Sequence, residues 1–365
     1  MTNYTYNEGD EVLNQFRLKK PLGKGGFGEV WLAQDRLLNQ EFALKIIALE
    51  SLFPDIDSFL KEAEKNRDIA RILKEARRGH HIIHKNLVKC HSANMDNQAF
   101  FIKMDYLENG SVTKTLNSEG FLPIKQVLTI MIDILRGLEH LHTNDILHND
   151  IKPDNIMIGN DNNYLLSDLG ISLNKLAPEP SSVYMPHLAP ELFKSPSFSK
   201  ASDIYQCGCT LFRLLNGVHL IKNQCSENEQ FIEKVSKGKL IKEIHYQLFI
   251  PPSLRTVIKK ATHSDPVQRY KSATDFRNAL EKLTIFADWD FNSEGLLVGE
   301  CCYNIYSFEE NPKSDGTSEF IAFKTSKKSK IRQKMSKFCG NNLSKKDLNK
   351  KKAYFLQSVV KGKIK

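Results

Sequence analysis

A short run of polar residues, His148-Asn-Asp150-Ile-Lys152-Pro-Asp-Asn155, constrains this chain more than any other feature. Within six residues it places a carboxylate, an ammonium and a carboxamide, and a second carboxylate, Asp168, follows thirteen residues after Asn155. Packing alone does not explain this set, because charged groups are costly to bury without partners. Together the groups supply a base for a hydroxyl, a cation for a phosphate and two oxygen ligands for a hard metal ion.

A glycine-rich run near the N-terminus points to the same chemistry. In Gly23-Lys-Gly25-Gly26-Phe27-Gly28 the glycines have G-x-G-x-x-G spacing, which lets a tight turn bring backbone N–H groups close to phosphates. In dinucleotide-binding folds such glycines open a helix. Here a strand-like segment, Val30-Trp-Leu-Ala, follows instead. Lys45 lies in a further apolar segment, where it either snorkels or holds a phosphate.

The hydrophobic periodicity changes along the chain. Strand-like segments occur between residue 16 and about residue 45 and again at 86–90 and 100–106, separated by an amphipathic helical pattern over 58–78. From Pro123 onward the apolar residues follow a helical period. A mostly β part followed by a mostly α part predicts two lobes with a ligand cleft between them.

Composition predicts a cytoplasmic protein. No run approaches the ~18 apolar residues of a membrane span, so we expect no transmembrane segment. The first ten residues are polar and do not resemble a signal peptide. The seven cysteines lack the spacing of a disulfide framework, which is typical of a reducing compartment.

These motifs, in this order, resemble the eukaryotic-type (Hanks-type) serine/threonine protein kinase family over about residues 10–285. Further matches are Ala189-Pro190-Glu191, Asp203 as a brace for the catalytic loop, and Arg269 as a partner for Glu191. The resemblance implies an α+β, two-lobed fold for a kinase domain over 10–286. Its β-rich N-lobe would span about 10–104 and its α-helical C-lobe about 108–286, with a small basic C-terminal extension over 287–365.

The resemblance also implies the reaction, in which ATP and Mg²⁺ are used to transfer the γ-phosphate to a protein serine or threonine, with tyrosine as the alternative acceptor. The implied catalytic residues are Asp150 as base, Lys152 on the γ-phosphate, Lys45 on the α- and β-phosphates, and Glu75 as the partner of Lys45. The implied metal ligands are Asn155 and Asp168. The implied nucleotide-binding residues are Leu22, Gly23, Gly25, Gly28, Val30, Ala43, Lys45, Met104, Asp105 and Leu107.

Two other functions stay open. A pseudokinase scaffold is disfavoured because Lys45, Asp150, Asn155 and Asp168 are all present. A small-molecule phosphotransferase shares the His-x-Asp core. Lys152, the Ala-Pro-Glu motif and Arg269 favour protein substrates, because they resemble parts that shape a peptide-binding surface.

The chain departs from the family pattern at several positions. Glu75 is favoured as the partner of Lys45 by its distance from His84, whereas Glu62 has the better spacing from Lys45 itself. Asn149 stands where the family usually has arginine, which predicts that no activation-segment phosphate is read through the catalytic loop. Leu169 replaces a phenylalanine, and Tyr184 stands near the usual threonine.

The positive charge is concentrated at the C-terminal end. Residues 312–365 hold 16 Lys and Arg but only 3 Asp and Glu, a net charge of +13, whereas residues 1–311 carry −4. This asymmetry predicts contact with a polyanion through 312–365, namely nucleic acid, an acidic membrane or an acidic protein. The alternative is a solvated basic tail with a docking helix. The pattern over 300–325 predicts a β-hairpin, followed by lysine-rich helices with Leu343, Leu348, Phe355, Leu356 and Val359 as candidate buried positions.

Overall fold

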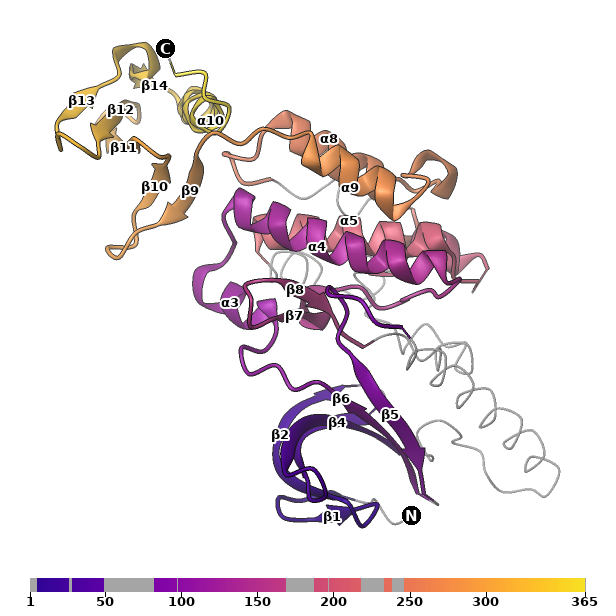
Figure 1. Cartoon of the computed structure of the whole chain (residues 1–365). Helices are drawn as coiled ribbons and strands as arrows, with labels where there is room; N and C mark the ends of the chain where they lie inside the picture. The colour runs from indigo at the N-terminus through magenta and orange to yellow at the C-terminus, as the bar shows by residue number, and fades with distance from the viewer. Residues whose placement is uncertain are drawn as a thin grey trace.

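The computed structural model describes residues 5–25, 28–48, 82–96, 98–168, 187–195, 197–217, 233–237 and 246–364. Figure 1 shows a curled β-sheet lobe at the N-terminal end, a helical lobe beside it, and a smaller unit of strands and one helix at the C-terminal end. The two-lobed α+β fold expected from the sequence is confirmed.

The N-lobe is a six-stranded antiparallel sheet in the order β1-β2-β3-β4-β6-β5. Its strands are β1 (Glu11–Val12), β2 (Phe16–Gly25), β3 (Gly28–Asp35), β4 (Gln40–Ala48), β5 (Cys90–Met95) and β6 (Ala99–Met104). The strand expected over 86–90 was placed too early. The backbone at 86–88 pairs instead with Leu166 of the other lobe, through Val88 N–H to Leu166 O at 3.0 Å and Leu166 N–H to Asn86 O at 2.9 Å.

The register of this sheet sorts its side chains onto two faces. Val30 lies opposite Lys45 across β3 and β4, and Ala43 lies opposite Met104 across β4 and β6. Directly opposed residues share a face of an antiparallel pair, and alternate residues along a strand do too. These four side chains therefore share one face. The other face holds a separate hydrophobic cluster that includes Phe16, Trp31, Leu44 and Phe101.

The C-lobe is mainly helical. Its described elements are α3 (Val112–Glu119), α4 (Ile124–Thr143), β7 (Ile156–Ile158), β8 (Tyr164–Leu166), α5 (Lys200–Asn216), α8 (Pro252–Ala261) and α9 (Ala273–Glu281). The apolar residues of helical period in α4 are buried, as the sequence predicts. Helix α5 begins at a capping box in which the side chains of Ser199 and Ser202 each bond the other residue's backbone N–H.

The C-terminal extension forms a second antiparallel sheet, in the order β13-β12-β11-β10-β9, with β14 also paired to β12. Its elements are β9 (Asp288–Phe291), β10 (Leu297–Glu300), β11 (Asn304–Pro312), β12 (Ser318–Ser326), β13 (Arg332–Lys334), β14 (Gly340–Leu343) and α10 (Lys345–Val360). Strands β11 and β12 form a hairpin in the region where one is expected. Of the described residues after β12, only those of α10 form an α-helix, because the backbone at 332–334 and 340–343 pairs with β12.

The extension packs directly against the C-lobe. The carboxylate of Asp288 accepts from the backbone N–H groups of Ile124 and Lys125 at 2.6 and 2.8 Å, and so caps α4, whose N-cap residue is a proline. Gln357 Nε2 donates to the carbonyl of Leu248 at 2.9 Å. One hydrophobic cluster runs through both units. None of the helices in the described segments is long and apolar enough to cross a membrane.

Candidate active site

The glycine-rich strand pair forms the edge of the site. Gly23 lies opposite Val30, and Gly25 lies opposite Gly28. Gly28 has φ +142°, and a Cβ atom there would lie 2.1 Å from the carbonyl oxygen of Ile46. Any side chain at this position would therefore have to displace the backbone of β4, which explains why position 28 requires glycine.

A contact between the ammonium of Lys45 on β4 and the carboxylate of Asp168 in the C-lobe joins the two lobes. Burial raises the pKa of Asp168, but the nearby cation Lys45, with smaller contributions from His148 and Lys152, outweighs it and holds the pKa below its usual value. Asp168 therefore remains ionised at neutral pH. It has φ +59°, a left-handed conformation that is uncommon for aspartate.

The segment after β6 connects the lobes. Met104 ends β6, and the backbone N–H of Asp105 donates to the carbonyl of Lys89 at 3.0 Å. Nε2 of His91 lies 2.6 Å from Oδ1 of Asp105. The carbonyl of Leu107 accepts from the N–H of Gly110 at 3.1 Å.

Asp150 lies at the centre of the catalytic loop. Its Oδ2 accepts from Lys152 Nζ at 2.7 Å and from Asn155 Nδ2 at 2.9 Å. Asn155 Nδ2 also donates to the Asp150 carbonyl at 2.8 Å. Because Nδ2 is engaged in this way, the side-chain oxygen Oδ1 of Asn155 is the atom that can serve as a ligand. This oxygen and the ionised carboxylate of Asp168 fit a hard divalent cation.

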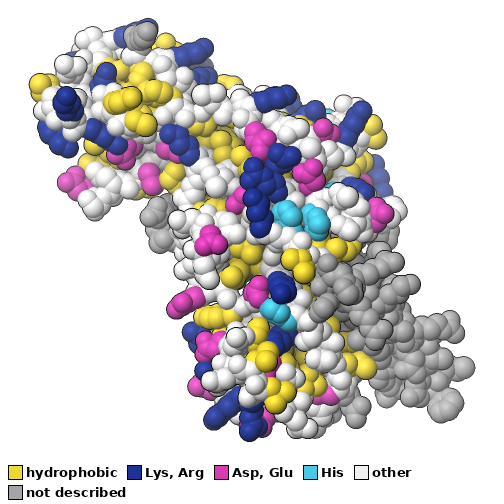
Figure 2. All heavy atoms as spheres, viewed as in Figure 1, with side chains coloured by type: hydrophobic (Ala, Val, Ile, Leu, Met, Phe, Trp, Pro, Cys, Tyr) yellow, Lys and Arg dark blue, Asp and Glu magenta, His cyan; other side chains and the backbone are white. Residues whose placement is uncertain are grey.

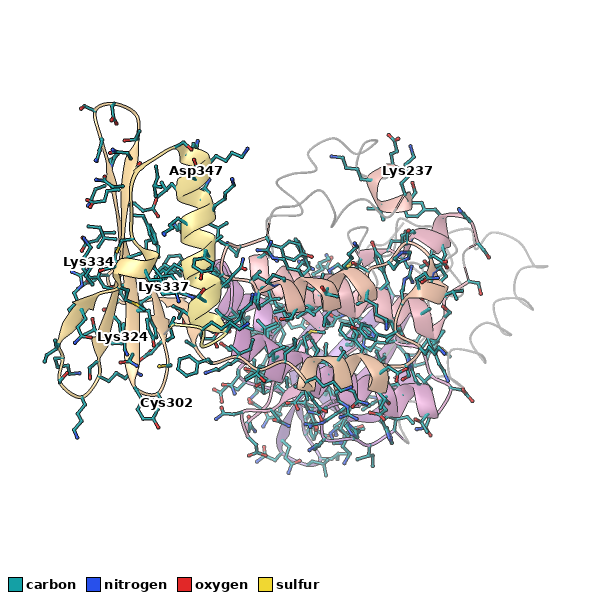
Figure 3. All side chains as sticks on the ribbon, turned by 90° about the horizontal axis from the view of Figure 1, so that it is seen from above. Lys237, Cys302, Lys324, Lys334, Lys337 and Asp347 are labelled. Carbon is teal, nitrogen blue, oxygen red and sulfur yellow. The ribbon has the colours of Figure 1, made fainter. Side chains whose placement is uncertain are left out.

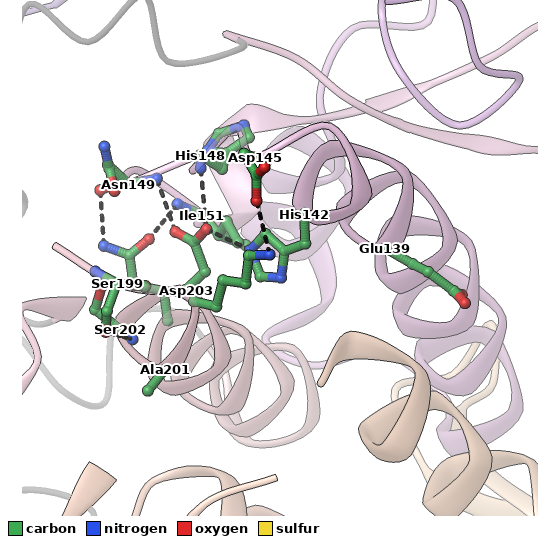
Figure 4. A network of polar contacts seen from close by, with 12 residues as sticks. Glu139, His142, Asp145, His148, Asn149, Ile151, Ser199, Ala201, Ser202 and Asp203 are labelled. Carbon is green, nitrogen blue, oxygen red and sulfur yellow. Dashed lines mark hydrogen bonds and ion pairs between the residues drawn. The ribbon is translucent and has the colours of Figure 1, made fainter. Parts of the chain in front are cut away.

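Asp203 on α5 holds the loop from below (Figure 4). It is fully buried and accepts from the backbone N–H groups of His148 at 3.0 Å and Asn149 at 2.8 Å, and its Oδ2 is 2.8 Å from His142 Nε2. The brace expected at this position is confirmed. Because these bonds hold the two residues immediately before Asp150, they fix the backbone that presents the base.

Gln206, one helical turn after Asp203, extends this brace. Its Oε1 accepts from Ile151 N–H at 2.9 Å and its Nε2 donates to the Asn149 carbonyl at 2.7 Å. We did not single out this residue from the sequence. Its i+3 spacing from Asp203, on the same face of a helix, is the signal that could have found it.

A buried histidine connects the loop to the segment before Ala189. His187 Nδ1 donates to the Ile151 carbonyl at 2.7 Å, and its Nε2 accepts from Arg213 at 3.0 Å. Burial and the charge of Arg213 lower the pKa of His187 well below its usual value, so the ring is neutral, as both bonds require. No local pattern in the sequence marks His187 or Arg213.

The pairing expected between Arg269 and Glu191 is confirmed. The guanidinium makes two parallel bonds to the carboxylate, at 2.7 and 2.6 Å, and also donates to the carbonyls of Ala201 and His263 at 2.9 and 2.7 Å. The side chain of Arg269 is fully buried. This bidentate pair anchors the Ala-Pro-Glu segment to the C-lobe.

Of the residues singled out from the sequence, Lys45, Asp150, Lys152, Asn155 and Asp168 thus lie in one connected site. Val30, Ala43 and Met104 share the sheet face of Lys45, and Leu22 is partly exposed on β2. Glu75 and Glu62 lie outside the described residues, as do Leu169 and Tyr184.

Comparison with known proteins gives a consistent result. Residues 16–281 match the family model of the protein kinase domain. The chain is 29% identical over 272 residues to the serine/threonine-protein kinase PrkC of Bacillus subtilis, covering 73% of this chain and 40% of that protein. It is 30% identical over 211 residues to the serine/threonine-protein kinase fray1 of Dictyostelium discoideum, covering 56% and 35%.

The serine/threonine-protein kinase PknD of Chlamydia trachomatis is 26% identical over 333 residues, covering 80% of this chain and 34% of that protein. The chain therefore spans only about two fifths, or less, of the length of these curated relatives. The family model, in contrast, spans most of the chain and includes the site described above. The chain belongs to the protein kinase domain family.

Proposed function

We propose that this protein is a serine/threonine protein kinase that transfers the γ-phosphate of ATP to hydroxyl groups of proteins. The observation that carries the proposal is the connected group of Asp150, Lys152 and Asn155, together with the Lys45–Asp168 contact across the lobes. Asp150 is held by Lys152 and Asn155, and Asp168 is paired with Lys45. Together these residues supply each charged group that phosphoryl transfer uses.

Each residue then has a role. Asp150 accepts the proton of the substrate hydroxyl, while Lys152 neutralises charge on the γ-phosphate. Lys45 holds the α- and β-phosphates and is oriented by Glu75, with Glu62 as the competing partner. Asn155 and Asp168 would hold Mg²⁺, which neutralises phosphate charge when bound.

The nucleotide is proposed to bind between the lobes. Val30 and Ala43 would pack against adenine, with Leu22 at the entrance, since these apolar side chains belong to the strands that flank Lys45. Gly23, Gly25 and Gly28 would cover the phosphates. The backbone of Asp105 and Leu107, after the gatekeeper Met104, would bond the adenine edge.

Protein substrates are favoured over small molecules by the Arg269–Glu191 pair, which anchors the segment that shapes a peptide-binding surface in this family. Serine and threonine are favoured by Lys152 in the catalytic loop and by the names of the relatives given above, all serine/threonine-protein kinases.

The test is mass-spectrometric mapping of phosphosites after incubation of the full-length protein with ATP and Mg²⁺, alone and with a mixture of generic protein substrates. The matched control is Asp150→Ala. We expect new phosphoserine and phosphothreonine with the wild type only, a difference of at least ~100-fold. ATP binding without any transfer to protein would indicate a scaffold. Transfer only to small molecules would indicate the other phosphotransferase class.

Further proposals concern the whole chain. We propose a kinase domain over 10–286 and an accessory extension over 287–365, which contacts a polyanion through the net charge of +13 in 312–365. We also propose that the protein acts in the cytoplasm, where ATP is available and where its free cysteines stay reduced.

A further inference from the structure

Two neighbouring turns at one end of the extension's sheet form a distinct surface. One turn, residues 301–303, joins β10 to β11, and the other, residues 327–331, joins β12 to β13. The backbone N–H of Lys327 donates to the carbonyl of Tyr303 at 2.9 Å, so the turns lie against each other. We call these two turns, with the adjoining Arg332, the sheet tip.

The sheet tip exposes apolar side chains that the fold does not use. Tyr303 is 75% exposed and Ile331 is 59% exposed, whereas Tyr306 and Phe320 in the adjoining strands are fully buried. A single exposed apolar residue is ordinary. Phe291 and Leu296, in the β9–β10 hairpin, are exposed as well. Two exposed apolar side chains on contacting turns indicate a surface that meets an apolar phase.

The sheet tip is also cationic. Its residues include Lys327, Lys328, Lys330 and Arg332 and no Asp or Glu. Within the sheet tip, Lys327 pairs with Glu300 at 2.5 Å and Arg332 with Glu309 at 2.7 Å. Lys328 and Lys330 are exposed and have no ion-pair partner among the described residues. Figure 2 shows lysines and arginines around hydrophobic side chains on the C-terminal extension.

The position of the sheet tip leaves it accessible. In Figure 3 Cys302, in the first turn, lies at one end of the sheet, and Asp347, in the first turn of α10, lies at the other end. Strand β12 has nine residues, which at ~3.3 Å per residue separate the two ends by about 30 Å. The two ends can therefore be tested independently.

We propose that the sheet tip docks on an anionic lipid surface, with Ile331 and Tyr303 entering the headgroup region and Lys328 and Lys330 contacting the acidic headgroups. Both features are needed for this assignment. Clustered lysines bind anionic headgroups, and tyrosine is enriched at the bilayer interface. A nucleic acid would be matched by the charge and by Tyr303, which can stack on a base, but it would leave the exposed aliphatic side chain of Ile331 without a stacking role. The inference specifies the proposed polyanion contact and does not depend on the phosphoryl-transfer chemistry.

The experiment is flotation of the full-length protein with phosphatidylcholine vesicles that contain about one third phosphatidylserine. Lys328→Glu/Lys330→Glu should weaken binding at least ~25-fold, since each cation near such a surface contributes about fivefold. Ile331→Ser should weaken it about tenfold, through the lost apolar contact. The matched control, Lys345→Glu/Lys346→Glu, makes the same change in net charge at the opposite end of the sheet and should weaken binding less than about threefold.

A Tyr303→Trp variant gives a second readout, because its emission should shift to the blue on these vesicles while the native Trp31 and Trp289 are already buried. Equal losses for the two double variants would overturn the proposal in favour of general charge attraction. An unaffected Ile331→Ser variant would exclude insertion. Binding to a single-stranded oligonucleotide without binding to vesicles would identify nucleic acid as the partner instead. Autophosphorylation is measured on the same samples, so that loss of docking and loss of catalysis are separate results.

Discussion

Lys103 on β6 and Asp35 at the end of β3 form a buried ion pair whose loss should destabilise the N-lobe. Nζ of Lys103 lies 2.7 Å from Oδ2 of Asp35, and the side chains are 8% and 0% exposed. The ammonium also lies 3.7 Å from the centroid of the Phe42 ring. Because Lys103 directly precedes Met104, and β6 pairs with the strand of Lys45, this pair supports the sheet that holds the proposed nucleotide site.

The magnitude follows from the partners that Asp35 would keep. Lys103→Met preserves the length of the side chain but leaves a buried carboxylate, and removal of one partner from a buried pair costs about 3–5 kcal/mol. Asp35 would still accept from Gln15 Nε2 and from the N–H groups of Leu37 and Leu38. We therefore expect the lower end, about 3 kcal/mol at pH 7, equivalent to a ~100-fold change in a local opening equilibrium.

The pH dependence gives an independent check. Burial raises the pKa of Asp35, but Lys103 and the other donors outweigh it and lower the pKa. In the wild type this carboxylate therefore contributes stability above its unfolded pKa, and the contribution is lost as the pH falls through the folded value. In Lys103→Met, burial should dominate and raise the pKa of Asp35, so that protonation of Asp35 removes the unpaired buried charge. The loss of stability relative to the wild type should therefore become smaller as the pH is lowered from 7 towards 4.

The assay is amide hydrogen exchange of the β3, β4 and β6 peptides, read by mass spectrometry, which needs no two-state unfolding of a multi-lobed protein. The control is Lys19→Met, which breaks an exposed pair with Glu41 in the same lobe and should change exchange less than about fivefold. Asp35→Asn/Lys103→Met should recover much of the loss, because no charge stays buried alone. A Lys103→Met effect no larger than that of Lys19→Met would refute the reasoning.

Three further predictions concern the proposed active site. Asp168→Asn should lower the rate of transfer at least ~100-fold and weaken ATP binding, measured calorimetrically, only when Mg²⁺ is present. Glu75→Gln should reduce activity strongly and Glu62→Gln only mildly, and the reverse ranking in a kinase assay would reassign the partner of Lys45. His187→Phe should lower kcat about tenfold with little change in ATP affinity, because it removes both bonds to the catalytic loop and to Arg213. An unchanged kcat would show that His187 does not position the loop.

Much of this architecture is legible in local patterns. The helical period from Ile124 to Leu141 predicts α4, and the glycine run followed by Val30 predicts two strands rather than a strand and a helix. The spacing of Asp150, Asn155 and Asp168 predicts a shared site. The structure brings the three residues together because the residues between Asn155 and Asp168 form the short hairpin of β7 and β8, which returns the chain to the same place.

Contacts between distant segments could not be predicted in the same way. Asp288 caps α4 from more than 160 residues away, and nothing around it marks a capping residue. Residues 332–334 of the extension are Arg, Gln and Lys, which favour helix as readily as strand. They become β13 because β12 offers an unpaired edge. In each case a tertiary partner decides the structure, and a single sequence does not contain its position.

Asn149, immediately before the proposed base, shows how a departure from the family pattern can be explained by the backbone. Its side chain is fully buried, yet neither Nδ2 nor Oδ1 has a hydrogen-bond partner in the part of the chain that the structure describes. Such a carboxamide costs about 1–3 kcal/mol when it is left unpaired. Its backbone, however, has φ +67°, where asparagine is tolerated much better than most residues.

Position 149 therefore requires the backbone conformation with positive φ rather than the amide group. We predict that substitutions there rank by how well each residue tolerates this conformation. Asn149→Gly should keep kcat and thermal stability close to the wild type, because it removes a polar group that has no partner among the described residues and because glycine fits positive φ. Asn149→Ala should lose about 1 kcal/mol, and Asn149→Val should lose more, because a β-branched side chain is strained there. Thermal unfolding and kcat on a protein substrate measure both effects. If Gly is as damaging as Val, the carboxamide itself acts at the site. If Val is tolerated as well as Gly, the backbone strain does not matter, and the explanation fails.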